Sequence, residues 1–352
     1  MTVLDQSGKA SSEASVIASL SMRHRWHVGE AIFWVCVVLA LFALPSRYLL
    51  INEIAVLALF ALSLDLVLGF AGIVSLGHAA FFGLGAYVAG LLTKQGMADP
   101  TLGLLIAAGA AALLGLATSF LVLRGSDLTR LMVTLGVGLV MGEIANQAAW
   151  LTGGADGLQG VAPGPILGMF SFDIFGRVAS IYSVCVLFVL FLAARRIVNS
   201  PFGLSLLAIR DNPLRAAALG IPVSRRLVAA YTIGAGYAGV AGALLAQTTQ
   251  FVSLDVFDFN RSADVLLVLI IGGTGYLYGG LVGAAVFRVL QDLIATITPQ
   301  HWQFWIGLIL VLLVLARRDR LAQLARRMVS PLLGRLGLAG LMRGGYASGA
   351  QR

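Results

Sequence analysis

Four carboxylates lie inside long apolar runs of the sequence, where an ionisable side chain is costly and therefore marks a functional hypothesis. They are Glu53, Asp65, Glu143 and Asp264. Glu143 has the most suggestive neighbours, because Asn146 and Gln147 follow it at spacings of three and four and would share its helical face. A carboxylate beside two amides could contact a solute that carries an ammonium group, and pairing between helices is the alternative. We therefore take Glu143, Asn146 and Gln147 as candidates for lining a transport pathway.

His78 stands in a run of small residues, between Gly77 and Ala79. Small residues let helices in a membrane approach closely, so we expect His78 to form a hydrogen bond to a neighbouring helix. Contact with a transported solute is the alternative, and His78 is kept as a candidate for pathway lining. The nearby Gly72, Gly77 and Gly83 indicate close packing more than ligand binding.

Sequence motifs of enzymes are absent. The only Gly-Lys pair, Gly8-Lys9, is followed by Ala10, so the chain has no phosphate-binding P-loop. It also has no His-Glu-x-x-His, Cys-x-x-Cys or Gly-x-Ser-x-Gly motif. Cys36 and Cys185 lie in apolar runs and indicate no disulfide framework. We therefore expect no catalytic residue, no metal ion and no cofactor in this chain, and any ATP that drives it would be hydrolysed by another chain.

The composition indicates which elements must hold these residues. Of 352 residues, 59% are hydrophobic and 11% are charged, and the mean hydropathy is +0.92. Soluble domains are about 25% charged, so this chain has too few charges to cover a surface in water. A soluble enzyme, a disordered chain and a nucleic-acid-binding protein are poor interpretations in spite of the net charge of +8. The composition predicts an all-α, polytopic membrane protein.

The apolar runs predict a transmembrane helix bundle of ten segments, since a helix needs about 20 residues to cross a bilayer. The run over 48–92 is long enough for two segments, with a break at 69–72, and the run over 262–297 for two shorter ones, broken at Gly272 and Gly273. The other six are 31–44, 101–123, 128–151, 178–194, 227–247 and 302–316. The predicted membrane domain therefore covers 31–316, between a tail over 1–30 and a basic tail over 317–352.

Basic residues gather in three places, which are the tail before the first segment, the loop over 195–226 and the tail from Arg317. The positive-inside rule predicts that all three are cytoplasmic, and with them both termini. Six segments before the loop and four after it agree with this orientation.

The loop over 195–226 carries the signals of a short, capped helix. These signals are Asp211 and Asn212 as N-caps, Pro213 in the first turn and Gly220 as the stop. They predict a helix from Pro213 to Leu219, in which Ala216 and Ala217 provide small side chains. Such a helix could sit in a groove of another protein, and an ordinary interhelical loop is the alternative.

Four motifs occur in a characteristic order. They are Gly72-Ile-Val-Ser-Leu-Gly-His-Ala-Ala-Phe-Phe-Gly-Leu-Gly-Ala-Tyr87, Leu151-Thr-Gly-Gly-Ala-Asp-Gly-Leu158, Ala208-Ile-Arg-Asp-Asn-Pro-Leu-Arg-Ala-Ala-Ala-Leu-Gly-Ile221 and Ile271-Gly-Gly-Thr-Gly-Tyr-Leu-Tyr-Gly-Gly280. From about residue 45 to 316 the chain resembles the permease subunits of branched-chain amino acid ABC importers, the LivM type more than the LivH type. The resemblance implies a fold like that of type II ABC importers, in a bacterial inner membrane.

The resemblance also implies partners. These are a second permease subunit, for which a LivH-like paralogue is expected, two cytoplasmic ATPases that bind ATP and Mg²⁺, and an external solute-binding protein. In this family the element over 208–221 corresponds to the coupling helix that docks into the ATPase. The residues that inherit this role are Arg210, Asp211, Asn212, Pro213, Ala216, Ala217 and Gly220.

The sequence departs from the family pattern at two places. Gly72-Ile73 stands where many members have Gly-Gln, and Arg124-Gly-Ser-Asp-Leu-Thr-Arg130 replaces the common Arg-Gly-x-Tyr-Phe-Ala. Members of the same superfamily carry urea, short amides or other small solutes, so these remain alternatives to leucine, isoleucine and valine. An alternative of a different class is an ion-coupled secondary transporter with Glu143 or Asp65 as its proton site.

Overall fold

The protein is described by a computed structural model that covers residues 28–97, 99–166, 168–173 and 175–315. The predicted tail over 317–352 and most of the predicted tail over 1–30 lie outside these residues. The described residues form two compact units that divide between Val289 and Leu290.

Apolar runs become helices here because a helix satisfies the hydrogen bonds of its backbone within one segment. Within the described residues, each of the ten predicted segments is a helix. They are α2 (Val28–Ala43), α3 (Tyr48–Leu64), α4 (Ala79–Lys94), α5 (Pro100–Val122), α6 (Asp127–Gln147), α8 (Arg177–Val198), α11 (Val223–Thr249), α12 (Phe259–Gly272), α13 (Leu277–Ile297) and α14 (Trp302–Leu315). Six helical runs are long and apolar enough to cross a membrane, and the shorter helices complete the set. The predicted all-helical polytopic class is confirmed.

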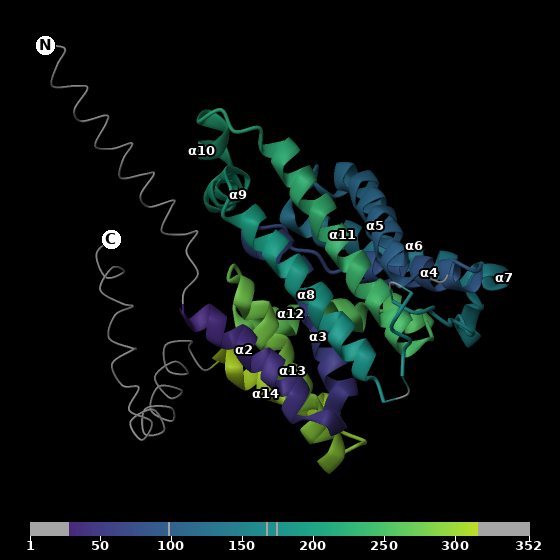
Figure 1. The fold of residues 1–352 in the computed structure, drawn as a ribbon. Coiled ribbons are helices and arrows are strands. Elements are labelled where there is room, and N and C mark those ends of the chain that lie inside the picture. The colour runs from purple at the N-terminus through teal and green to yellow at the C-terminus, as the bar shows by residue number, and fades with distance from the viewer. Residues whose placement is uncertain (1–27, 98, 167, 174, 316–352) are drawn as a thin grey trace, which may run out of the picture. The chain divides into compact units, whose positions relative to one another are not determined.

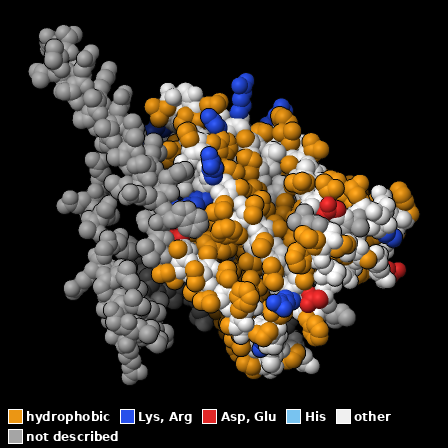
Figure 2. Space-filling view, viewed as in Figure 1, with side chains coloured by type: hydrophobic (Ala, Val, Ile, Leu, Met, Phe, Trp, Pro, Cys, Tyr) orange, Lys and Arg blue, Asp and Glu red, His pale blue; other side chains and the backbone are white. Residues whose placement is uncertain are grey.

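Short elements connect these helices. α7 (Ala149–Thr152) follows α6, while α9 (Pro201–Asp211) and α10 (Pro213–Ala218) lie between α8 and α11. Figure 1 shows α9 and α10 together at one end of the α8 and α11 helices. On the face seen in Figure 2, hydrophobic side chains cover much of the surface, and several Lys and Arg side chains gather at the end that carries α10.

The core of the first unit is built around α11, which packs against α3, α4 and α5. Glycines make this packing close: a Cβ atom on Gly242 would collide with the backbone of Phe82, and one on Gly239 with the side chain of Ala111. α6 is the least buried of the six long helical runs, with 17% of its most apolar stretch buried, against 28% for α5 and α13 and 78% for the run that contains α3. It therefore presents most of its surface outward.

The predicted break near 69–72 takes an unexpected form. α3 continues as a wider π turn over Asp65–Phe70, and the chain then reverses at Gly72, where φ is +72°. Residues 73–78 return alongside α3, with the Ile73 N–H donating to the Val67 carbonyl at 3.0 Å. α4 starts only at Ala79, so this non-helical backbone is buried against protein, as it must be at membrane depth.

Candidate functional site

The predicted docking helix is present as α10. The Asn212 side chain caps it by accepting a hydrogen bond from the Arg215 N–H at 2.9 Å, and Gly220 ends it with φ of +83°. Two large apolar side chains are exposed here, Leu214 on the helix (85%) and Leu219 directly after it (74%). An exposed pair of large apolar side chains on a well-capped short helix is a surface suited to docking.

Two features of this loop were not predicted. The α9 helix is not among the elements predicted from the sequence, although Ser200-Pro201 is a helix-start signal and Leu206 and Ile209 lie on one side. Both side chains are buried, so α9 joins α10 firmly to the bundle. Ala216, predicted to lie on the docking face, is 1% exposed, because α10 turns it inward, whereas Ala217 is exposed.

Arg210, at the end of α9, joins this loop to α3. Its guanidinium Nη1 donates to the carbonyl of Gly69, in the π turn. The same side chain passes Gly72, where an added Cβ atom would lie 2.9 Å from the Arg210 Cγ. Its charge also acts on Asp65, which is fully buried one turn before Gly69. The end of α9 is thus bound to the point where α3 stops.

The glycine turn between α12 and α13 also contacts Asp65 and Arg210. The Gly275 N–H donates to Asp65 Oδ1 at 2.7 Å, and an added Cβ atom on Gly275 would lie 3.0 Å from the Arg210 Nη1. Gly275 has φ of +79°, a conformation that L side chains rarely adopt. We call Asp65, Gly69, Gly72, Arg210 and Gly275 the Arg210 junction. Three segments far apart in the sequence meet in it.

The motif glycines hold the broken segments close together. A Cβ atom would collide with the Thr134 backbone at Gly77, with the Phe257 ring at Gly83 and with the Gly279 backbone at Gly272. Gly273 has φ of +97° and ends α12. Gly77 and Gly83 thus lie at close-packed positions, and Gly272 and Gly273 lie at the predicted break between two segments.

His78 is buried, with 0% exposure, at the start of α4. Its Nε2 lies 2.9 Å from the Ser63 Oγ, and Ser63 donates its single hydroxyl proton to the Phe60 carbonyl, so the ring donates from Nε2. The ring also stacks on Phe60, with centroids 5.6 Å apart. His78 therefore binds α3 in this conformation and reaches no open surface.

Glu143, Asn146 and Gln147 are all exposed on α6. The Gln147 Nε2 donates to Glu143 Oε1 at 2.8 Å, which confirms that these two share a helical face. Leu139 and Val140, one turn earlier, are also exposed. These polar side chains lie at the C-terminal end of α6, so this part of the helix contacts water, lipid headgroups or another protein chain rather than the hydrocarbon interior of the membrane.

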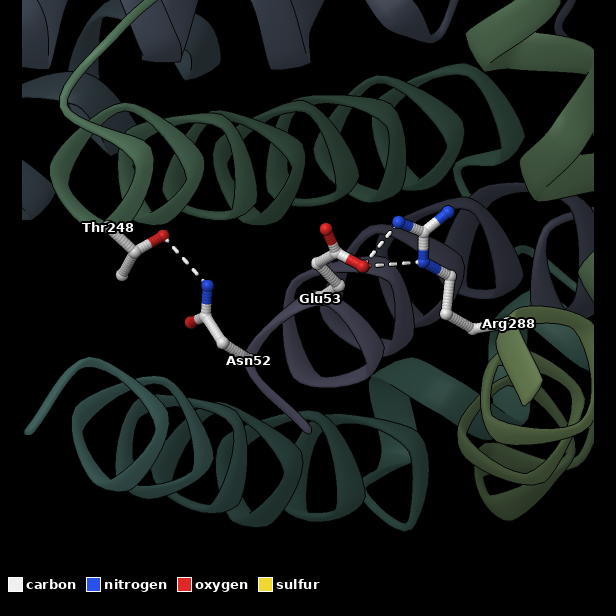
Figure 3. Close-up of polar contacts among 4 residues, drawn as sticks. All are labelled: Asn52, Glu53, Thr248 and Arg288. Atoms are coloured by element: carbon white, nitrogen blue, oxygen red, sulfur yellow. Dashed lines mark hydrogen bonds and ion pairs between the residues drawn. The ribbon is translucent and has the colours of Figure 1, made fainter. Parts of the chain in front are cut away.

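Glu53 and its neighbour Asn52 are instead paired across the bundle (Figure 3). Glu53 Oε2 accepts from the Arg288 Nε at 2.7 Å, and the Asn52 Nδ2 donates to Thr248 Oγ1 at 3.0 Å. Asn52 also accepts from Ser183 at 2.6 Å. These contacts join α3 to α13, α11 and α8. Glu53 and Asn52 therefore pair between helices, which is the alternative to lining a pathway.

The remaining charged candidates form no metal centre. Asp264 is half-buried on α12, with Arg261 and Arg288 as the cations that act on it. Among the described residues, no group of three His, Cys, Asp or Glu side chains could hold a metal ion. Two surfaces remain as candidates, the exposed α10 helix with the Arg210 junction and the polar end of α6 with Glu143, Asn146 and Gln147.

Comparison with known proteins agrees with this arrangement. The family described as branched-chain amino acid transport system / permease component matches residues 48–316. The high-affinity branched-chain amino acid transport system permease proteins LivM of Salmonella typhimurium and Escherichia coli are each 29% identical, over 293 and 294 residues, which are 76% of this chain and 68% of each relative.

A more distant relative has a different printed function. The autoinducer 2 import system permease protein LsrC of an Enterobacter species is 28% identical over 282 residues, which are 77% of this chain and 78% of the relative. No solved structure matches the chain significantly. Because the family match covers most of the sequence, the chain belongs to the family described as branched-chain amino acid transport system / permease component, and it is a multi-pass, non-catalytic permease subunit of an ABC transporter.

Proposed function

We propose that this permease passes leucine, isoleucine and valine across a bacterial inner membrane after an external solute-binding protein delivers them. Two LivM relatives whose names specify branched-chain amino acids support this substrate class. The polar face of α6 is its proposed contact with the solute and with a second, LivH-like permease subunit. An amino acid carries an ammonium group, to which the carboxylate of Glu143 is complementary.

The observation that carries the mechanism is the exposed, capped helix α10. In the proposal its leucines, Leu214 and Leu219, enter a groove of a cytoplasmic ATPase, and the end of the bundle with α10 is cytoplasmic. Two such ATPases bind ATP and Mg²⁺, while this chain contributes no hydrolytic group. The basic residues of the loop over 195–226 favour this orientation.

The Arg210 junction gives the docking helix a mechanical route into the membrane core. A displacement of α9 and α10 would pull on the π turn of α3 through the Gly69 carbonyl, and on the α12–α13 turn through Asp65 and Gly275. The π turn follows Ser63 of α3, which contacts His78 at the buried start of α4. ATP-driven movement would reach them without passing along the whole length of α8 or α11.

Another small solute is the second candidate, because LsrC is named as a permease for autoinducer 2. Urea and short amides belong to the same alternative. An ion-coupled secondary transporter is no longer supported, since the family match identifies a permease component of a transport system.

Uptake of labelled leucine tests the substrate. Cells that lack this chain should lose uptake, and cells in which it is restored should regain it, with isoleucine and valine as competitors and urea and acetamide as non-competitors. Absence of leucine uptake in cells that express the whole transport system would exclude the branched-chain assignment and leave the permease class unaffected. Inhibition by urea or acetamide would point to the second candidate.

A further inference from the structure

The surface of the first unit has two grooves of about 700 and 710 Å³. The first lies between α5, α8 and α11, and no charged residue lines it. The second runs between α5 and α11 at the end of these helices nearest α10, and two arginines line it, Arg124 and Arg225. Two grooves of nearly equal size therefore differ in their chemistry.

The two arginines form no ion pair with a carboxylate in the described part of the chain. Arg124 follows the end of α5 and Arg225 lies in the first turn of α11, and both are exposed. Neither forms an ion pair there, in contrast to Arg195, which is 2.9 Å from Glu30. A cation in the first turn of a helix also opposes the helix dipole. A bound anion would pair with both arginines and offset the unfavourable interaction of Arg225 with the helix dipole.

The groove becomes less polar with distance from the arginines. Thr232 lies two turns after Arg225, roughly 10 Å along α11, and its hydroxyl has no hydrogen-bond partner among the described residues. Leu116, Phe120, Val228 and Ile233 provide apolar walls. Cations, a hydroxyl and an apolar channel thus occur together in one groove.

We infer that this groove binds an anionic phospholipid, with its phosphate between Arg124 and Arg225 and an acyl chain along α5 and α11. The argument is charge complementarity: basic pockets between membrane helices favour anionic headgroups, and the apolar walls match the chain below the headgroup. The uncharged groove beside α8 lacks the first of these features. The inference holds whichever solute the permease carries.

Lipid binding to the purified full chain, with the subunits that co-purify with it, tests the inference by native mass spectrometry. After removal of native lipid, phosphatidylglycerol should bind more tightly than phosphatidylcholine. Each arginine near a headgroup contributes about fivefold in affinity, so the double variant Arg124→Gln/Arg225→Gln should bind phosphatidylglycerol about 30-fold more weakly. The matched control Arg196→Gln, an exposed arginine at the end of α8 outside the groove, should bind it normally.

A second variant distinguishes lipid binding inside the groove from nonspecific electrostatic attraction to the two arginines. Ala229→Phe should fill the groove and weaken phosphatidylglycerol binding while both arginines remain. Unchanged binding by either variant, equal binding of the two lipids, or equal loss in Arg196→Gln would overturn the inference. Efficient cross-linking of Ser224→Cys to another protein subunit in native membranes would overturn it as well, because the groove would then be a protein interface.

Discussion

Replacing Arg210 by glutamine should uncouple ATP hydrolysis from transport. The variant removes the cation that donates to the Gly69 carbonyl and acts on the buried Asp65. It leaves α10 and its exposed leucines unchanged, so the ATPase should still bind. The α9–α10 loop would then move without displacing the π turn of α3 or the α12–α13 turn.

The magnitude follows from the contacts. A hydrogen bond to a charged group contributes about 1.5–3 kcal/mol, and the lower half of that range applies because the Arg210 side chain is 38% exposed. Loss of the nearest cation also leaves the Asp65 carboxylate, with 0% exposure, less well compensated. We expect Arg210→Gln to lose about 2–3 kcal/mol of stability in total.

The double variant Arg210→Gln/Asp65→Asn distinguishes folding from coupling. The amide that replaces the Asp65 carboxylate still offers a carbonyl oxygen to the Gly275 N–H, and it carries no charge that needs a cation. The double variant should therefore recover about half of the lost stability, but it should not recover transport. Arg196→Gln, which removes the same charge from an exposed position of the loop over 195–226, is the matched control for uptake and ATPase activity.

The assay uses the complete transporter in proteoliposomes and measures ATP hydrolysis, its stimulation by the solute-binding protein, and solute uptake. For Arg210→Gln we expect basal hydrolysis to persist, with stimulation and uptake reduced at least tenfold. Normal stimulation and uptake in the folded double variant would refute the reasoning. Gly275→Ala should also reduce uptake because its methyl group meets Arg210, whereas Gly160→Ala, with a similar φ of +76° and open space around it, should not.

Three further predictions concern separate parts of the chain. Leu214→Glu should abolish co-purification of the ATPase. The stability of the permease should change by no more than about 0.5 kcal/mol, because this side chain is 85% exposed. Normal co-purification would exclude α10 as the docking site. Glu143→Gln should raise the KM for uptake and leave assembly and ATP hydrolysis unchanged, because it removes the charge but not the contact with Gln147. An unchanged KM would show that Glu143 does not line the pathway. Hydrogen bonds from the Thr101 side chain and backbone lower the pKa of Asp99, the N-cap of α5. The Asp99 carboxylate therefore stabilises the fold fully above the ordinary Asp pKa of about 3.9, and this stabilisation is lost as the pH falls through the lowered pKa. Thermal unfolding of Asp99→Asn measured against pH should lack this acid-dependent loss of stability.

The sequence alone determined the helical class, the helical segments and the short capped helix α10. Each depends on residues that are close together in the chain. Apolar runs are long enough to cross a bilayer without reference to their neighbours. The cap of α10 involves Asn212 and Arg215, three residues apart, and its end depends on Gly220 alone.

The tertiary structure decided which polar residues are exposed and which are paired. Sequence reasoning treated His78 and Glu143 alike as candidates for the pathway, yet His78 is buried against Ser63 and Glu143 lies on an open helix face. The run of small residues around His78 signalled close packing, but it could not identify the partner. Exposure depends on which helices pack together, and hydrophobic periodicity is weak in a chain where nearly every helix is apolar on all sides.

The Arg210 junction could be found only in three dimensions. Arg210 meets Gly69 across 141 positions of sequence, and Asp65 meets Gly275 across 210. The glycines at 72 and 275 carried a local signal for a turn, but a turn does not reveal which side chain passes through the space that the missing Cβ atom leaves. Local chemistry therefore specified the helices and their ends, while the long-range contacts that could carry movement between them arose from the packing of segments that the sequence keeps apart.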